Sequence, residues 1–226
     1  MSLTCLIIPA YNESKHIGSV LSHVLSKFGS FFGEIVVVDD GSDDDTSGIA
    51  KGYGVVVLRH DRNMGKGMAL RTGFSYALER GYELVMTMDG DGQHDPEDIP
   101  RFMERMGRGD ADIVLGARVL DRRRMPIHRR LNNRLVSAVG SWLSGQKVVD
   151  FQCGYRLIRS EVLKAIKLET RRYETESELL IKAGRMGFRI VSIPIRAIYN
   201  GAKSNVRPFT EMRLFTLLLL KSLRER

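Results

Sequence analysis

The sequence predicts an α/β sandwich of Rossmann-like type, with a mostly parallel central sheet and helices on both faces. In the first half of the chain, short apolar runs alternate with segments of helical periodicity. Strands separated by helices of this length imply right-handed crossovers between parallel strands. Polar clusters follow the first four apolar runs. Because ligands bind beyond the carboxyl ends of such strands, the clusters predict a site at one edge of the sheet.

The first half of the chain supplies five strands. Residues 3–10, LTCLIIPA, form an apolar run typical of a strand buried on both faces. Behind it, apolar residues recur at helical spacing from Ile17 to Phe28, with Asn12 as a candidate N-cap. Residues 42–45 are expected to cap the helix after the second strand. Strands are predicted at 3–10, 34–40, 55–60, 83–89 and 111–117, and helices at 12–28, 43–54, 67–81 and 96–106.

The second half is less regular. Residues 135–145 predict an apolar helix with Trp142 in the core, and residues 148–166 predict a strand or turn followed by a helix. A helix at 175–187 precedes a β-rich run, 188–199, in which Pro194 marks an edge or irregular strand. We expect one domain over residues 1–200 and an amphipathic C-terminal helix in the tail, 201–226.

Composition places the chain among soluble globular proteins, with 43% hydrophobic and 27% charged residues. The first ten residues lack a signal-peptide pattern. The longest apolar run of the tail, Leu214–Leu220, is far shorter than the roughly 20 residues of a membrane span. We therefore expect a cytoplasmic location without a transmembrane span. The two cysteines, Cys5 and Cys153, are expected to be reduced and buried.

The positive charge is concentrated in residues 118–134. This segment has seven arginines against one acid, Asp121, and so carries +6 of the formal net charge of +8. An anionic partner is expected there. The segment has no interleaved aromatics and no nucleic-acid motif, so nucleic acid is not predicted. A patch formed with residues 125–127 and the leucine-rich tail would suit the peripheral surface of an anionic membrane. A solvated loop and a tail packed on the core are the alternative.

The stretch DGDGQHD, residues 89–95, follows the fourth apolar run. Asp89 and Asp91 flank a glycine, so both carboxylates can face one side, and Gln93 adds an amide oxygen. Such hard ligands suit Mg²⁺ or Mn²⁺. The alternative is an ordinary loop, since aspartate and glycine are common in turns. His94 is interpreted as an exposed loop residue, with a position near the metal group as the alternative. After the second run, Asp39 and Asp40 could accept hydrogen bonds from a nucleobase or ribose.

Six ordered motifs resemble those of the family 2 glycosyltransferases of GT-A fold. They are IIPAYNE, VVVDDGSDDDT, NMGKGMALRTG, MDGDGQHDPED, GAR and DFQCGYRLIRSEVL, within residues 3–200. The chain most resembles the polyprenyl-phosphate glycosyltransferases, a group that includes the dolichyl-phosphate mannose synthases. The resemblance implies a GT-A sandwich and a nucleotide-sugar donor.

The resemblance also implies roles for individual residues. The nucleotide sugar would be bound by Pro9, Tyr11, Glu13, Asp40, Lys66 and Asp89, with an exposed Lys66 as the alternative. The metal would be held by Asp89, Asp91 and Gln93. The reaction centre would contain Asp91, Arg118 and Arg130. Acid–base chemistry or acceptor positioning would fall to Asp150, Arg156, Glu176 and Glu178.

The implied activity is metal-dependent transfer of a hexose, with inversion, from a donor of GDP-mannose or UDP-glucose type to a polyprenyl or dolichyl phosphate. A lipid phosphate is already anionic and needs positioning rather than a strong base. A soluble family 2 transferase acting on a glycan or polysaccharide is the alternative, and it would need a carboxylate base. A non-catalytic nucleotide-sugar binder is a third hypothesis, which the intact metal ligands disfavour.

Overall fold

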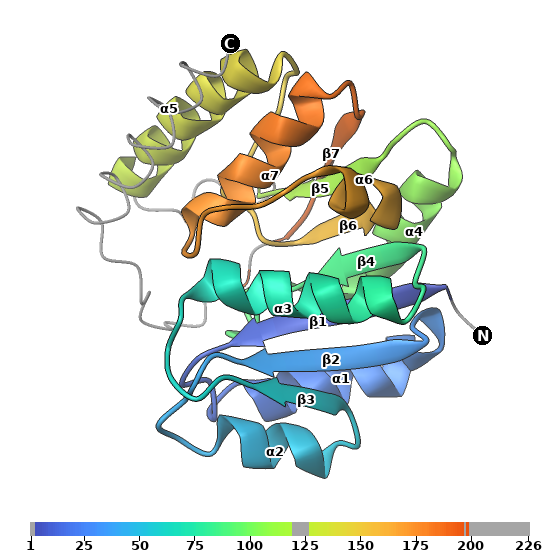
Figure 1. Ribbon diagram of the computed structural model, residues 1–226, viewed down its shortest axis with the longest axis vertical. Helices are drawn as coiled ribbons and strands as arrows, with labels where there is room; N and C mark the ends of the chain where they lie inside the picture. Colours follow the sequence, from blue (N-terminus) through green and yellow to red (C-terminus); the bar gives the residue numbers. More distant parts are fainter. Residues whose placement is uncertain (1–2, 119–126, 197, 199–226) are drawn as a thin grey trace.

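A seven-stranded sheet forms the centre of the protein (Figure 1). The computed structural model describes residues 3–118, 127–196 and 198, and only the backbone of residues 127–132. The strands lie in the order β3-β2-β1-β4-β6-β5-β7. Only β6 runs antiparallel to its neighbours in this sheet. The strands are β1 (Thr4–Ala10), β2 (Glu34–Asp39), β3 (Val56–Arg59), β4 (Leu84–Thr87), β5 (Ile113–Ala117), β6 (Arg156–Arg159) and β7 (Ile190–Pro194).

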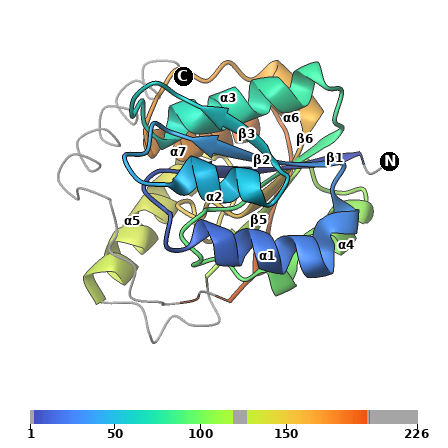
Figure 2. The same cartoon turned by 90° about the horizontal axis from the view of Figure 1, so that it is seen from below.

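Helices cover both faces of the sheet, as the alternating sequence pattern predicts. In Figures 1 and 2, α3, α6 and α7 lie on one face and α1 and α4 on the other. Helix α5 packs against α7. The helices are α1 (Ile17–Phe28), α2 (Thr46–Gly52), α3 (Lys66–Glu79), α4 (Ile99–Gly107), α5 (Ile127–Ser144), α6 (Ser160–Ala165) and α7 (Glu174–Arg185), with short 3-10 turns at Gly29–Phe31 and Pro96–Asp98.

The central strand β1 sets the position of the polar edge, which is the carboxyl edge of the sheet where polar segments follow β1, β2 and β4. All seven of its residues are buried, because it pairs with β2 on one side and β4 on the other and has helices above and below. Ala10 pairs with Asp39 and Ile7 with Thr87, so these three parallel strands end close together. The strand order changes direction between β1 and β4, which is the point where doubly wound sheets bind ligands.

The loop after β1 corrects the predicted N-cap of α1. Asn12 does not cap that helix, which begins at Ile17 after His16. Instead Asn12 has a positive φ of 56°, and its Oδ1 accepts a hydrogen bond of 2.8 Å from the backbone N–H of Asp43. Asn12 tolerates this left-handed conformation better than most residues. Its side chain therefore joins the loops that follow β1 and β2.

The start of α2 matches the predicted cap only in part. Asp45 occupies the N-cap position, but no side-chain cap hydrogen bond forms there. The preceding Asp44 accepts the backbone N–H of Thr46 at 3.0 Å with one oxygen and that of Ser14 at 3.0 Å with the other. The acidic run thus ties α2 to the loop before α1.

Trp142 corrects the prediction of a core position. Its side chain is 56% exposed, whereas Val136 and Leu143 of the same helix are buried. Helix α5 packs against α7, so only one side of α5 is covered by that helix. Trp142 lies on its exposed side, together with Leu135.

The predicted C-terminal helix and the arginines at 122–124 lie outside the described residues. Among the residues that are described, every helix is too short or too polar to cross a membrane.

Both cysteines are buried free thiols, as predicted. Burial, with a smaller contribution from a nearby carboxylate, raises the pKa of Cys5 and of Cys153 to about 12. Thiolate is the reactive form, and at pH 8 a pKa of about 12 leaves roughly one thiol in ten thousand ionised.

We expect neither cysteine of the native protein to react with Ellman's reagent at pH 8 within an hour, and both to react within seconds in guanidinium chloride. Absorbance at 412 nm measures the thionitrobenzoate that each reacting thiol releases from the reagent. Rapid reaction of one equivalent without denaturant would contradict the buried placement of that cysteine.

Candidate active site

The predicted site residues gather at the carboxyl edge of β1, β2 and β4. Pro9 lies within β1, and Tyr11 and Glu13 follow it. Asp40 directly follows β2, and Asp89 lies two residues after β4. Helices α3 and α7 bring further polar residues to this edge.

A partly buried ion cluster joins α3, α7 and the segment after β4. The ammonium group of Lys66, the first residue of α3, lies 2.7 Å from Asp89 Oδ1 and 3.2 Å from Glu176 Oε1 on α7. Its side chain is only 16% exposed, so the exposed alternative for Lys66 is wrong. Burial would lower the pKa of Lys66, but the two carboxylates raise it above its usual value. Lys66 is therefore a fixed cation at the polar edge.

Glycines allow the cluster to form. A Cβ atom on Gly154 would lie 2.8 Å from Asp89 Oδ1 and 2.9 Å from Glu176 Oε1, closer than normal packing permits. Gly65, just before Lys66, has a φ of 101° and lies so close to the 171–172 backbone that a Cβ would be 2.6 Å from Arg171 O. The NMGKG motif thus places the start of α3 directly against the segment that leads into α7.

Asp40 holds the loop that leads to Lys66. Its carboxylate accepts the backbone N–H groups of Met64 at 2.9 Å and Gly65 at 2.7 Å, and it lies 2.7 Å from His60 Nδ1. Asp40 is only 2% exposed. The sequence pattern predicted a contact with the nucleoside, whereas the structure shows a carboxylate that supports the Lys66 loop. The part played by His60 was not predicted.

Glu13, Asp89 and Asp91 influence one another electrostatically beside Lys66. Burial and then the charges of Asp91, Asp89 and Asp44 raise the pKa of Glu13 to about 7. Burial and then the charge of Asp89 also raise the pKa of Asp91. Asp91 Oδ1 accepts the backbone N–H of Gln93 at 2.9 Å. The described residues contain no group of three or more His, Cys, Asp or Glu side chains arranged to hold a metal. A cation here would need additional ligands, such as phosphate oxygens.

His94 is buried, which corrects its interpretation as an exposed loop residue. Its ring stacks on Tyr155 with 5.0 Å between the centroids. The backbone N–H of Asp89 donates to His94 Nδ1 at 3.1 Å, so the proton of the neutral ring lies on Nε2. Burial lowers the pKa of His94 despite the adjacent Asp89. His94 thus fixes the backbone of Asp89 as a neutral residue.

Arg118 and Asp150 form a bidentate ion pair. Arg118 Nε lies 2.7 Å from Asp150 Oδ2 and Nη2 lies 2.9 Å from Oδ1. Asp150 is buried, and Arg118 keeps a quarter of its side chain exposed. Although burial would raise the pKa of Asp150, Arg118 lowers it. Asp150 therefore orients the guanidinium and is a poor base.

Arg156 and Glu178 have internal partners rather than open positions at the edge. Arg156 is 2% exposed and donates to the carbonyl groups of Cys153 at 2.9 Å, Glu176 at 2.8 Å and Phe151 at 3.2 Å. Glu178 accepts the backbone N–H groups of residues 169 and 170 and pairs with Lys182 at 2.6 Å. These contacts argue against the predicted acid–base or acceptor roles and support a structural role for both residues.

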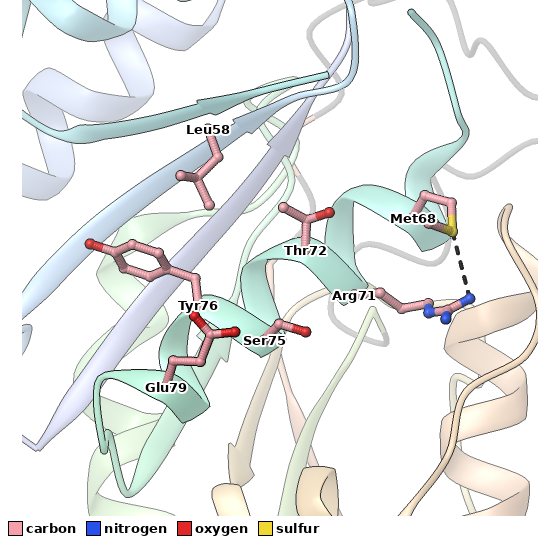
Figure 3. Close-up of a pocket in the computed structure, with 7 residues that line it drawn as sticks. All are labelled: Leu58, Met68, Arg71, Thr72, Ser75, Tyr76 and Glu79. Carbon is pink, nitrogen blue, oxygen red and sulfur yellow. Dashed lines mark hydrogen bonds between the residues drawn. The ribbon is translucent and has the colours of Figure 1, made fainter. Parts of the chain in front are cut away.

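One predicted side chain is not described, and one groove lies apart from the predicted residues. The side chain of Arg130, predicted for the reaction centre, lies outside the described residues. A groove of about 400 Å³ lies between the outer side of α3 and β3, and contains none of the predicted residues (Figure 3). It is lined by Leu58, Met68, Arg71, Thr72, Ser75, Tyr76 and Glu79.

The chain is similar in sequence to known proteins. The model of the family described as "Glycosyl transferase family 2" matches residues 5–167. A UDP-N-acetylglucosamine–dolichyl-phosphate N-acetylglucosaminyltransferase of Methanococcus voltae is 33% identical over 87% of this chain and 86% of its own. An undecaprenyl-phosphate mannosyltransferase of Micrococcus luteus is 33% identical over 84% of this chain and 81% of its own.

Among solved structures, glucosyl-3-phosphoglycerate synthase from Mycobacterium tuberculosis, in complex with Mn²⁺, UDP and phosphoglyceric acid, is similar in fold. The TM-score is 0.74 at 21% identity, over 97% of this chain and 76% of that one. This likeness confirms the predicted GT-A type of α/β fold.

We expect the Arg156→Met variant to lose about 3 kcal/mol or more of unfolding free energy, because three buried carbonyl groups lose their donor. Urea denaturation measures the loss. The matched control is Arg108→Met at the C-terminal end of α4, whose exposed guanidinium pairs with the exposed Glu104. That change should cost less than about 0.5 kcal/mol. Unchanged stability of Arg156→Met together with lost ligand binding would instead support a substrate contact.

Proposed function

The chain belongs to glycosyl transferase family 2, and we propose that it transfers a hexose from a nucleotide sugar to a polyprenyl phosphate with inversion. The relatives from M. voltae and M. luteus are named for different sugars but for the same class of acceptor, a polyprenyl phosphate. Their similarity therefore supports the acceptor class more strongly than the identity of the sugar. A donor of GDP-mannose or UDP-glucose type remains our proposal.

The observation that carries the acceptor assignment is the state of the three carboxylates predicted as acid–base candidates. Asp150 is bound by Arg118, Glu176 is paired with Lys66, and Glu178 is bound by a loop and Lys182. The pKa values of Asp150 and Glu178 are lowered by these partners, although burial opposes the change. Carboxylates of this kind are poor at removing a proton from a sugar hydroxyl.

A phosphate acceptor does not need such a base. Its oxygen is already ionised near neutral pH, so it must mainly be oriented toward the anomeric carbon. Arg118 suits that task, because Asp150 fixes its guanidinium and part of the side chain stays exposed. The concentration of arginines in residues 118–134 provides further positive charge in the same part of the chain.

The carboxylates at the polar edge fit a divalent cation. Burial, and after it repulsion from neighbouring carboxylates, raises the pKa values of Glu13 and Asp91, so a cation would relieve part of this repulsion. We propose that Asp89, Asp91 and Gln93 hold Mg²⁺ or Mn²⁺. When bound, the ion would stabilise the charge of the leaving nucleoside diphosphate. Glu13 and Tyr11, at the exit of β1, are proposed to border the nucleotide.

The proposed transfer can be tested with purified protein, Mn²⁺, radiolabelled GDP-mannose or UDP-glucose, and undecaprenyl or dolichyl phosphate. We expect a labelled product that partitions into chloroform, and no product when the unphosphorylated polyprenol replaces the phosphate. Asp91→Asn should reduce the rate at least 100-fold, since loss of a metal ligand removes stabilisation of the leaving group. Glycosylation of a saccharide or peptide, with none of the lipid phosphate, would contradict the proposal.

Access to a lipid acceptor requires contact with a membrane surface, and α5 offers a suitable face. Leu135 and Trp142 are 65% and 56% exposed and lie seven residues apart, on one side of the helix. Arg134 beside them is exposed as well. Tryptophan with neighbouring basic residues is typical of helices that lie at the lipid interface. We propose that this face of α5 contacts the membrane.

We expect the protein to float with phosphatidylglycerol vesicles in a density gradient, and the Leu135→Ser/Trp142→Ser variant to float at least fivefold less. Tyr53→Ser, which removes an exposed aromatic residue at the end of α2, is the matched control and should float like the parent protein. Equal flotation of all three proteins would show that α5 does not provide the membrane contact.

A further inference from the structure

We propose that Lys66 competes with the divalent metal for the carboxylate of Asp89. In the absence of donor, the ammonium group of Lys66 pairs with Asp89, and a donor diphosphate then attracts that ammonium group away from Asp89. This role rests on the proposed function in two respects, the metal group that includes Asp89 and the nucleoside diphosphate donor. Lys66 thereby couples metal binding to donor binding.

The competition follows from the shared carboxylate. Asp89 is the first carboxylate of the proposed metal group, and its Oδ1 already lies 2.7 Å from Lys66 Nζ. A divalent ion on the same carboxylate would stand only a few ångströms from the ammonium group. At this separation the divalent ion and the ammonium group would repel each other strongly, because the site is partly buried. Metal without donor must therefore displace Lys66 or bind beside an unfavourable charge.

The surroundings keep Lys66 close to the site when it leaves Asp89. Glu176 lies 3.2 Å from its ammonium group and supplies a second anion on α7. The ring of Tyr173 lies 5.7 Å from the ammonium group, a distance that suits a cation–π contact. Lys66 can therefore exchange one anion for another through a rotation of its own side chain.

A donor diphosphate would supply that anion. Its oxygens complete the ligands of the metal, and they also provide a new partner for the displaced ammonium group. Metal and diphosphate then each bind better in the presence of the other, as thermodynamic coupling requires. Since free metal binds poorly in this arrangement, the metal arrives mainly together with the nucleotide.

A simple structural ion pair makes a different prediction. If Lys66 only stabilised the fold, its removal would distort the site and weaken the binding of every ligand. If it competes with the metal, its removal should improve metal binding in the absence of nucleotide. The sign of the change in metal affinity separates the two roles.

The test is a titration with Mn²⁺ followed by electron paramagnetic resonance, without nucleotide and with UDP or GDP. Without nucleotide, we expect Lys66→Met to bind Mn²⁺ at least tenfold more tightly than the parent protein. The tightening of Mn²⁺ binding on adding UDP or GDP should be correspondingly smaller in the variant. Lys66→Arg, which keeps the charge, should resemble the parent. Lys51→Met removes an exposed lysine of α2 and is the matched control.

Equal or weaker binding of Mn²⁺ by Lys66→Met would overturn the proposal. If this variant does not fold, the Lys66→Met/Glu176→Gln double variant keeps the net charge of the cluster and takes its place. The increase in melting temperature on adding Mn²⁺ should then exceed that of the parent, and an equal or smaller increase would overturn the proposal. Failure of lipid glycosylation with the Mn²⁺ result intact would refute only the acceptor assignment, and the converse result would refute only this inference.

Discussion

The contact of Lys66 with Asp89 and Glu176 is the interaction on which the polar edge of the sheet depends. It joins the start of α3, the exit of β4 and the first turn of α7, which are separated by long stretches of sequence. Carboxylates brought together in a partly buried site repel one another unless a cation lies among them. Lys66 supplies that cation in the protein alone, and we propose that a divalent metal supplies it in the presence of donor.

The sheet topology explains why these groups can meet. Parallel strands β1, β2 and β4 end at the same edge, and the change in strand direction between β1 and β4 opens a place for ligand. Antiparallel β6 then returns the chain beside β4. The loop before β6 carries Asp150 and Gly154. Arg156, the first residue of β6, joins that loop to α7 through hydrogen bonds to the carbonyl groups of Cys153 and Glu176. One side of the site is thus built by the loops that follow the parallel strands β1, β2 and β4. The other side is built by the loop that leads into antiparallel β6.

Local sequence patterns were sufficient for the fold, because strands buried on both faces and helices with one apolar side have distinct periodicities. The same patterns located the polar edge and placed Lys66 and Asp89 on it. They failed where a residue's role depends on a distant partner. His94 is buried because Tyr155 stacks on it, and Arg156 is enclosed by carbonyl groups of separate segments. Trp142 is exposed because of how α5 meets α7. Sequence alone gives the chemistry of such residues but not their neighbours.

We propose that the polar edge binds the metal and the donor diphosphate together, and that Lys66 then exchanges Asp89 for a phosphate oxygen. A crystal structure of the protein with Mn²⁺ and UDP or GDP tests it most directly. We expect an ion bound by Asp89 and Asp91, with the Lys66 ammonium group moved from Asp89 to a phosphate oxygen. An ion bound elsewhere, or an unchanged contact between Lys66 and Asp89 beside a bound diphosphate, would contradict it.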